Sequence, residues 1–425
     1  MRGGGFSYQG TQREPPRGGL YCSELPYNRV NGGVSIHISD FCCSKWTPGP
    51  LPARFLMEGN ARGCVHDSTR LLHIFQERSW AVATIAETFI HEDRVIERSH
   101  VAVVIPTLNA HKCWTAFRDG LRSQGLPAGQ VLIIDSSSGD GTRELALTEG
   151  YQVYRIERRD FDHGGTRKLA LEMVPWADVV VYLTQDAVLA TPDSVDLLLS
   201  AFEDRTVAAA YGRQLPRLGA GPIEAHARLF NYPAQSDVRD FESRHTLGIK
   251  AAFLSNSFSA YRVSALREVG GFPTDVIMAE DAIVAAKLLL AGWKTAYVAE
   301  AQVYHSHAYT ISQEFRRYFD TGVYHNQVGW LREKFGDPVG EGKRFILSEL
   351  AFLAPRHLHL VLLAMVRSIA KAIGYSLGLR EAALGRGLSR RLSFHKGYWD
   401  SHSSAKATKT LKMEDRERGA TFWGG

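Results

Sequence analysis

The segment VLIIDSSSGDGTRELALTEGYQVYRIE, residues 131–157, contains the repeating unit from which the fold can be predicted. It begins with an apolar run closed by Asp135, a pattern typical of a buried strand. A stretch with helical spacing follows over 142–149, and Gly150 marks the end of that helix. The run 151–157 predicts a second strand. A strand, a helix and a strand at this spacing favour a parallel β–α–β unit.

The same alternation continues on both sides of this unit. Further strands and helices are predicted, in chain order, at 101–106, 111–124, 164–174, 178–187, 257–272 and 279–298. Beyond residue 190 the alternation is looser. Strands that alternate with helices argue for a sheet covered by helices on both faces. We therefore predict an α/β fold with a doubly wound, mainly parallel sheet over residues 100–310.

The composition is that of a soluble globular protein, with 425 residues, 44% of them hydrophobic and 22% charged. This length is enough for two or three domains. The formal net charge of +5 suits an anionic ligand and an anionic membrane surface equally well. The five cysteines form no C-x-x-C pair and show no metal-ligand spacing. Their odd number, together with an N-terminus that lacks an apolar signal segment, predicts a cytoplasmic location.

The two ends of the chain differ in composition from its middle. Residues 1–55 are rich in glycine, proline, serine and arginine without a regular period, so we predict that they are disordered or not native. Residues 56–99 are an extension of unclear structure, either a short helix and strand or a stretch upstream of the natural start. We expect 311–400 to be helical and 401–425 to be a disordered tail.

The most apolar stretch of the chain is 345–379, within the C-terminal helical region. Pro355, Arg356, Arg367 and Lys371 interrupt it, so we expect no spanning run of about 18 apolar residues. Basic residues beside apolar faces suit a helix that lies in a membrane interface. An ordinary buried helical hairpin is an equally good interpretation of the same residues.

Polar residues follow the first two predicted strands. Asp135 precedes the small residues SSSGDGT, so its carboxylate can accept a hydrogen bond from a ring N–H while a ligand approaches the backbone. PTLNA, residues 106–110, follows the neighbouring strand, and the two together mark the crevice where α/β proteins bind nucleotides. Asp140 and Thr142 are equally well explained as helix caps. The chain has no G-x-G-x-x-G and no P-loop motif, which disfavours dinucleotide binding and P-loop chemistry.

The segment FDHGGTRKLA, residues 161–170, is a candidate anion site. Its two glycines precede a helix and would expose backbone N–H groups, and Arg167 adds a cation, so the segment suits a diphosphate. The alternative is that Asp162 or Thr166 caps the helix while Arg167 makes a surface ion pair.

Acids and histidines lie at three further ends of predicted elements. Asp186 follows a buried strand, at a position where ligands bind in α/β proteins. One carboxylate alone, however, provides few ligands for a metal ion. Glu280 and Asp281 open a helix, where acids often only complement the helix dipole. His305 and His307 follow a strand and lie on the same side of it. Histidine is a frequent ligand of divalent cations, although a single histidine at a strand end is usually structural.

Taken in order, these segments resemble one family. VVIPTLNA, IIDSSSGDGT, FDHGGTRKLA, LTQDA, AEDAIVAAKLLLAGW and VYHSHAYT are similar to the motifs of bacterial family-2 glycosyltransferases of GT-A fold. FDHGGTR, TQDA and FRRYFDTGVYH (residues 315–325) resemble the L-rhamnosyltransferase branch, which assembles cell-surface polysaccharides. The resemblance covers roughly residues 100–400.

The resemblance implies an inverting, metal-dependent enzyme that transfers L-rhamnose from dTDP-L-rhamnose to a hydroxyl of a growing, lipid-linked glycan such as O-antigen. It would act at the inner face of the cell membrane, on whose anionic surface it would lie, with Mg²⁺ or Mn²⁺ and without a nucleic-acid partner. Two alternatives stay open. One is the same chemistry with a UDP-hexose or GDP-sugar donor, and the other is a catalytically silent nucleotide-sugar-binding scaffold.

The resemblance also implies roles for single residues. Most relatives carry D-x-D where this chain has Thr184 and Asp186, and Asp186 would bind the metal together with His305. Asp281 would be the general base and Glu280 would orient the site. In the donor site, Asp135 would bind the pyrimidine ring and Arg167 would contact the phosphates. The nucleotide-sugar-binding residues would be Pro106, Thr107, Asn109, Asp135, Ser137, His163, Arg167 and Gln185.

Overall fold

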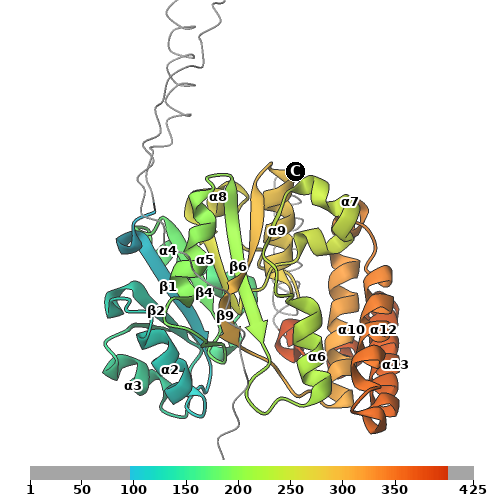
Figure 1. Ribbon diagram of the computed structural model, residues 1–425. Coiled ribbons are helices and arrows are strands. Elements are labelled where there is room, and N and C mark those ends of the chain that lie inside the picture. Colours follow the sequence, from blue (N-terminus) through green and yellow to red (C-terminus); the bar gives the residue numbers. More distant parts are fainter. Residues whose placement is uncertain (1–95, 401–425) are drawn as a thin grey trace, which may run out of the picture. The chain divides into compact units, whose positions relative to one another are not determined.

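The structure is a computed structural model that describes residues 96–400 (Figure 1). Within this part, nine strands form a sheet in the order β3-β2-β1-β4-β8-β6-β9-β5, and β7 pairs with β9. The strands are β1 Val101–Thr107, β2 Val131–Asp135, β3 Gln152–Arg155, β4 Val179–Leu183, β5 Val188–Leu189, β6 Val207–Leu215, β7 Asp237–Arg239, β8 Phe258–Arg262 and β9 Lys294–Tyr304. The predictions for 1–55 and 401–425, and for most of 56–99, lie outside the described residues.

The first four strands form as the apolar runs of the sequence predict. The pairs β1–β2, β1–β4 and β2–β3 are all parallel. All side chains of β2 and β4 are buried, because helices cover both faces of the sheet. Val103 and Ile105 enter one core, where Phe117 packs, and Val104 enters the other, where Leu171 packs. Helices on both faces confirm the predicted doubly wound α/β architecture.

The second half of the sheet mixes strand directions. β8 lies antiparallel between β4 and β6, and β6 pairs in parallel with β9. β6 and β9 therefore run in the same direction as β1–β4, whereas β5, β7 and β8 run the opposite way. The sheet is mainly parallel, as predicted. The long strand β6 is missing from the predicted elements, because its alanines carry little of the β-branched signal that marks a strand.

The helices cover the sheet and extend beyond it. They are α2 Trp114–Arg122, α3 Thr142–Thr148, α4 His163–Met173, α5 Ser194–Leu199, α6 Pro222–Asn231, α7 Arg244–Leu247, α8 Val263–Glu268, α9 Glu280–Leu290, α10 Ile311–Gln327, α11 Gly329–Phe335, α12 Val339–Leu353, α13 Val361–Gly378, α14 Glu381–Leu384 and α15 Arg386–Leu392. The region after β9 is helical, as the sequence predicts, and Figure 1 shows α10, α12 and α13 side by side.

The helices α10 and α13 pack backbone against backbone. A Cβ atom on Gly374 would lie 2.3 Å from the carbonyl oxygen of Phe315, and one on Gly378 would lie 2.0 Å from that of Phe319. Glycine is therefore required at both positions for the helices to approach this closely. Because the contact partners advance together along both helices, α10 and α13 run in the same direction.

The apolar segment 345–379 forms the end of α12, a short 3₁₀ turn and α13. Its helix Leu358–Gly378 is long and apolar enough to cross a membrane by length and composition, contrary to the expectation from the sequence. Arg367 and Lys371, its two charges, do not face outward. They lie 2.9 and 3.5 Å from carboxylate oxygens of Glu314 in α10, with side chains only 15% and 11% exposed.

After α15 the chain turns back toward the carboxyl ends of the strands, and we call residues 393–399 the C-terminal strap. The backbone N–H groups of Phe394 and His395 both donate to Oδ2 of Asp320 at 2.9 Å. Asp320 is completely buried, and burial raises its pKa to about 6. Trp399 is buried in an apolar cluster with side chains of α10. The strap is therefore fixed at both of its ends.

Candidate active site

A cavity of about 530 Å³ opens at the carboxyl ends of β4, β6 and β9. This edge of the sheet is where ligands bind in α/β proteins. Six of the residues predicted from the sequence line it: His163, Arg167, Asp186, Glu280, Asp281 and His305. The structure thus brings the predicted metal ligands and the predicted base into one cavity, although they are far apart along the chain.

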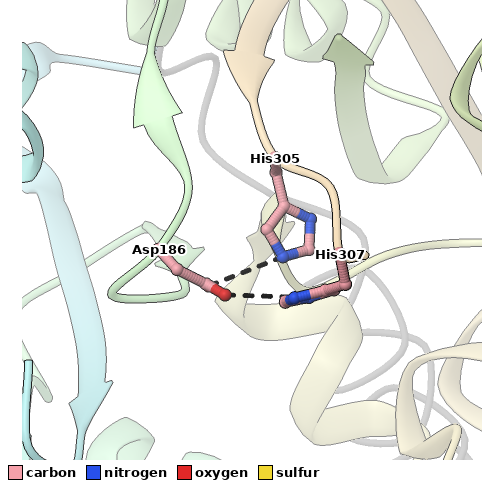
Figure 2. Close-up of side chains that lie close together, drawn as sticks. All are labelled: Asp186, His305 and His307. Atoms are coloured by element: carbon pink, nitrogen blue, oxygen red, sulfur yellow. Dashed lines mark ion pairs between the residues drawn. The ribbon is translucent and has the colours of Figure 1, made fainter. Parts of the chain in front are cut away.

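Asp186, His305 and His307 form a candidate metal site. The Nε2 atoms of His305 and His307 lie 3.5 and 3.7 Å from carboxylate oxygens of Asp186. One ligand atom from each residue lies within 4.8 Å of the others, and Figure 2 shows the three side chains converging from two chain segments. One carboxylate and two imidazoles fit a divalent cation such as Mn²⁺. The predicted ligand set contained Asp186 and His305 but omitted His307.

The charges at this cluster favour metal binding. Burial alone would raise the pKa of Asp186, but its interactions with His305 and His307 outweigh burial and hold this pKa well below its usual range. Burial and the neighbouring His305 lower the pKa of His307 to about 4. Nδ1 of His305 lies 2.9 Å from Oε1 of Gln214. Because this oxygen only accepts, Nδ1 is the donor in this contact, and Nε2 is the ring nitrogen that faces Asp186 and is placed to bind a metal.

Glu280 and Asp281 begin α9, as the sequence predicts. They follow Ala279, whose φ of 60° lies in the left-handed region that residues other than glycine rarely adopt. Strain of this kind gathers at functional sites. Asn256 holds both acids, because its backbone N–H donates to Oδ2 of Asp281 and its side-chain amide donates to Oε1 of Glu280, both at 3.0 Å.

Asn256 is itself fixed by two hydroxyl groups. Ser259 Oγ and Tyr261 OH donate to its Oδ1 at 2.8 and 2.7 Å, so its amide nitrogen must face Glu280. The side chain is 3% exposed. No motif in the sequence singled out this residue.

A buried ion pair sets the charge of the two acids. Nη1 of Arg167 lies 3.0 Å from Glu280, with both side chains almost fully buried. Burial opposes ionisation of Glu280, but Arg167, His163 and Asn256 outweigh it and lower the pKa of Glu280. Burial and the adjacent Glu280 raise the pKa of Asp281 to about 7. A carboxylate with such a pKa is suited to accept a proton near neutral pH, whereas Glu280 is committed to its ion pair.

The start of α4 has the Asp162 cap that the sequence offered as an alternative, and the anion site stays a prediction. Asp162 caps the helix and accepts a hydrogen bond from the N–H of Gly165 at 2.6 Å. A Cβ atom on Gly164 would lie 1.7 Å from the carbonyl oxygen of Pro273. The glycines therefore serve a helix cap and a close backbone contact. Arg167 is buried, so the alternative of a surface ion pair is wrong, and its contact with donor phosphates stays a prediction.

Four predicted nucleotide-binding residues lie at the adjacent ends of β1 and β2, outside the lining of the cavity. Thr107 Oγ1 donates to Asp135 at 3.2 Å, and both residues are buried. Asn109 and Ser137 have left-handed φ angles of 52° and 59°. Strained loops at two neighbouring parallel strand ends are consistent with the predicted nucleotide crevice.

The remaining two predicted residues have mainly structural contacts. The side-chain amide of Gln185 accepts from the backbone N–H of Leu108 at 2.7 Å and donates to its carbonyl at 3.0 Å. Gln185 thus ties the end of β4 to the loop after β1. Pro106 lies within β1 itself. Nucleotide binding by these residues stays a prediction.

Several residues that line the cavity were assigned no role from the sequence. They include Arg228, Tyr309, Arg317 and His395. Arg317 lies in the segment 315–325, whose resemblance to a family motif was the only available signal. His395 belongs to the C-terminal strap, and its ring lies edge to face with that of His163, with 5.3 Å between the ring centroids. Only the fold brings these two rings together.

Comparisons with known proteins identify relatives of this chain. The model of the family described as glycosyl transferase family group 2 matches residues 179–319. The O-antigen chain rhamnosyltransferase RfbN of Salmonella typhimurium is 43% identical over 312 residues, which are 73% of this chain and 99% of that protein. The N-acetylglucosaminyl-diphospho-decaprenol L-rhamnosyltransferase of Mycobacterium tuberculosis is 31% identical over 216 residues, 43% of this chain and 68% of that protein.

A solved structure is also similar. It is the mannosyltransferase PcManGT from Pyrobaculum calidifontis in complex with GDP-Man and Mn²⁺, with 20% sequence identity and a TM-score of 0.41. The similarity covers 79% of this chain and 93% of that chain. A likeness of this size carries no ligand over to the present chain.

Proposed function

This chain is a member of the family 2 glycosyltransferases, and from this membership we propose that it transfers L-rhamnose from dTDP-L-rhamnose, with inversion, to a hydroxyl of a lipid-linked, O-antigen-type glycan. The name of the Salmonella relative, an O-antigen chain rhamnosyltransferase, supports the sugar and the glycan. The name of the mycobacterial relative, which contains diphospho-decaprenol, supports an acceptor carried on a lipid diphosphate.

The observation that carries this proposal is the pairing of two different centres in one cavity. The candidate metal site around Asp186 lies in the same cavity as Asp281, a partly buried carboxyl group with a pKa raised to about 7. Transfer with inversion needs both, because negative charge grows on the leaving diphosphate while a proton leaves the acceptor hydroxyl. A silent scaffold would need neither a strained acid pair nor a tuned base.

Asp281 would take the proton from the acceptor hydroxyl as that oxygen attacks the anomeric carbon on the face opposite the diphosphate. Asn256 and Arg167 would keep Glu280 ionised and in place, and Glu280 in turn keeps the pKa of Asp281 high enough for a base. A divalent cation, Mn²⁺ or Mg²⁺, held by Asp186 and the two histidines would stabilise the charge on the leaving diphosphate.

The donor nucleotide would lie at the ends of β1 and β2. Asp135 would accept from the pyrimidine ring, and Thr107 holds this carboxylate in position. The strained loops that contain Asn109 and Ser137 would shape the pocket. The positions of His163 and Arg167 in the cavity lining suit contacts to the sugar-diphosphate part of the donor.

A donor screen tests this proposal. Purified protein with Mn²⁺ and a lipid-linked acceptor should turn over dTDP-L-rhamnose faster than UDP-hexoses or GDP-sugars. Preference for another nucleotide sugar would keep the family chemistry and change the donor. Binding of a nucleotide sugar without turnover of any donor would support the scaffold alternative.

We also propose that the enzyme lies on an anionic membrane surface. One face of α13 exposes large apolar side chains, namely Leu362, Leu363, Met365, Val366, Ile369 and Ile373. The outward face of a helix in a water-soluble protein normally carries the charges. Here Arg367 and Lys371 face α10 instead, so the pattern is inverted. An apolar outer face suits contact with lipid.

The packing of α13 favours a helix that lies on the membrane over one that crosses it. Glycine contacts bind α13 to the backbone of α10, and α10 contains the buried Asp320 that anchors the C-terminal strap. Crossing the bilayer would separate the two helices and leave Glu314 without its partners. The expected attraction to the membrane therefore depends on the apolar face of α13 and not on Arg367 and Lys371.

A further inference from the structure

One side of the cavity is built by the C-terminal part of the chain. We call this side the acceptor wall, and its residues are Tyr309, Arg317, the supporting Phe394, and His395; all but Phe394 line the cavity, and the Phe394 ring packs against that of Tyr309. The first follows β9, the second belongs to α10, and the last two belong to the C-terminal strap. The guanidinium carbon of Arg317 lies 4.8 Å from the ring centroid of Tyr309 and 5.8 Å from that of Phe394.

Arg317 is an uncommitted cation in the cavity. Arg167 is paired with Glu280, and Arg228 donates to the side chain of Gln214. Within residues 96–400, by contrast, no carboxylate forms an ion pair with Arg317. The two aromatic rings stabilise its guanidinium group without using its N–H donors. A planar, fully charged donor group held in this way is suited to phosphate oxygens.

Hydrogen bonds hold the acceptor wall in place. Asp320, one turn after Arg317 in α10, accepts hydrogen bonds from the backbone N–H groups of Phe394 and His395 in the strap, both at 2.9 Å. Arg367 of α13 donates to the carbonyl oxygen of Tyr309 at 2.7 Å. The wall is therefore joined both to the strap and to the helix that exposes the apolar face.

This connection gives a route for a lipid-linked molecule. Arg367, in the second turn of α13, donates to the carbonyl oxygen of Tyr309, so the first half of α13 lies near the start of α10, where Tyr309 lines the cavity. Leu358 and Leu362, at this end of α13, are each 71% exposed. A lipid chain lying along this face would bring its head group toward Tyr309, and the guanidinium group of Arg317 lies over the Tyr309 ring.

We propose that Arg317 binds a phosphate group of the lipid-linked acceptor and so directs the acceptor sugar into the cavity. The inference rests on the proposed function, which supplies a lipid diphosphate as the acceptor carrier. The proposed function assigns the diphosphate of the donor to the candidate metal site around Asp186. The uncommitted charge of Arg317 is thus left for the second diphosphate.

Direct binding of farnesyl diphosphate tests the proposal without requiring turnover. The full-length protein is first saturated with dTDP and Mn²⁺, which fills the donor side, and the dissociation constant of farnesyl diphosphate is then measured by calorimetry. Arg317→Gln should weaken this binding by about tenfold or more, the effect of losing a charge-assisted contact to phosphate. Arg317→Lys, which keeps the charge, should lose less.

Arg316→Gln is the matched control, since Arg316 is the half-exposed neighbour of Arg317 and does not line the cavity. It should leave the binding of farnesyl diphosphate and of dTDP unchanged. Equal affinities of Arg317→Gln and wild type for farnesyl diphosphate would overturn the proposal. Weaker dTDP binding in Arg317→Gln but not in Arg316→Gln would also overturn it, because Arg317 would then contact the donor. Melting temperatures close to that of wild type establish that each variant is folded.

The donor screen and this binding experiment fail independently. If the enzyme prefers a donor other than dTDP-L-rhamnose, the proposed function changes, but the effect of Arg317→Gln on farnesyl diphosphate is still expected. If turnover follows the proposal and farnesyl diphosphate binds independently of Arg317, only the acceptor wall is wrong.

Discussion

Two regions of this protein bury charged groups, and they do so in opposite ways. At the start of α9, Glu280 is paired with Arg167, whereas the adjacent and partly buried Asp281 forms no ion pair within the described residues. Between α10 and α13, Glu314 lies against two basic side chains and the charges compensate one another. Uncompensated charge raises the pKa of a carboxyl group and prepares it for proton transfer, whereas compensated charge serves packing. The first arrangement serves chemistry and the second serves structure.

The largest effect is expected at the uncompensated charge. Asp281→Asn should cut turnover by on the order of 10²–10⁴-fold, because the amide cannot accept the acceptor proton. Donor binding should be nearly unchanged, since the general base acts on the acceptor. Steady-state kinetics and a donor dissociation constant measure the two effects separately. Turnover near the wild-type level would place the base elsewhere.

Loss of the metal cluster should affect the donor instead. Asp186→Ala removes the only carboxylate of the candidate metal site, so donor binding in Mn²⁺ or Mg²⁺ should weaken and stimulation by metal should largely disappear. His307→Ala should weaken metal stimulation too, which distinguishes a three-ligand site from the predicted pair of ligands. Full activity of the wild type in excess chelator would exclude a metal requirement.

At the compensated charges the expected effect is on stability. Glu314→Gln leaves two buried basic side chains without a countercharge and should lower the free energy of unfolding by on the order of 3 kcal/mol. Urea unfolding measures the change. The exposed pair of Arg98 and Asp196 offers a control, since Asp196→Asn should have little effect there. Similar losses in the two variants would mean that the buried pairs contribute no more than a surface pair.

A smaller and more specific effect is expected at Glu280. Glu280→Gln removes the charge that, after burial, raises the pKa of Asp281. The pKa of Asp281 should then fall, so the carboxylate persists to lower pH. The acidic limb of the profile of kcat/KM against pH should therefore move to lower pH, by about one unit. Glu314→Gln should leave this limb in place, and an unmoved limb in Glu280→Gln would exclude the coupling.

The sequence predicted the parts of this protein that follow local rules. Apolar runs predicted β1 to β4, because a strand that is buried on both faces of a sheet consists of consecutive apolar residues. Helix signals predicted α9. Asp186 and His305 were predicted at strand ends, and the structure places them together. The direction of β8 and the existence of β6 could not be read, because strand pairing depends on residues distant in sequence.

The parts of the site that sequence reasoning missed depend on long-range contacts. Asn256 touches the two acids from another segment, and His395 reaches the cavity only because Asp320 anchors the strap. The glycines in the first turn of α4 show the same limit from the other side. They fit an anion site by sequence, but Gly164 is required by its contact with Pro273. A local pattern does not reveal which distant group a residue meets.

The smallest expected effect concerns the outer face of α13, the helix whose inner face carries the ion pairs to Glu314. Leu362→Ser with Ile369→Ser should reduce flotation with anionic liposomes several-fold, because each exposed apolar side chain adds favourable transfer into the membrane interface. Leu147→Ser with Leu290→Ser, exposed leucines of α3 and α9, is the control and should float like the wild type. Since Arg367 and Lys371 face Glu314, salt should weaken flotation only modestly. Equal flotation of both double variants would exclude this face as the contact, and flotation that survives alkali would indicate a crossing helix.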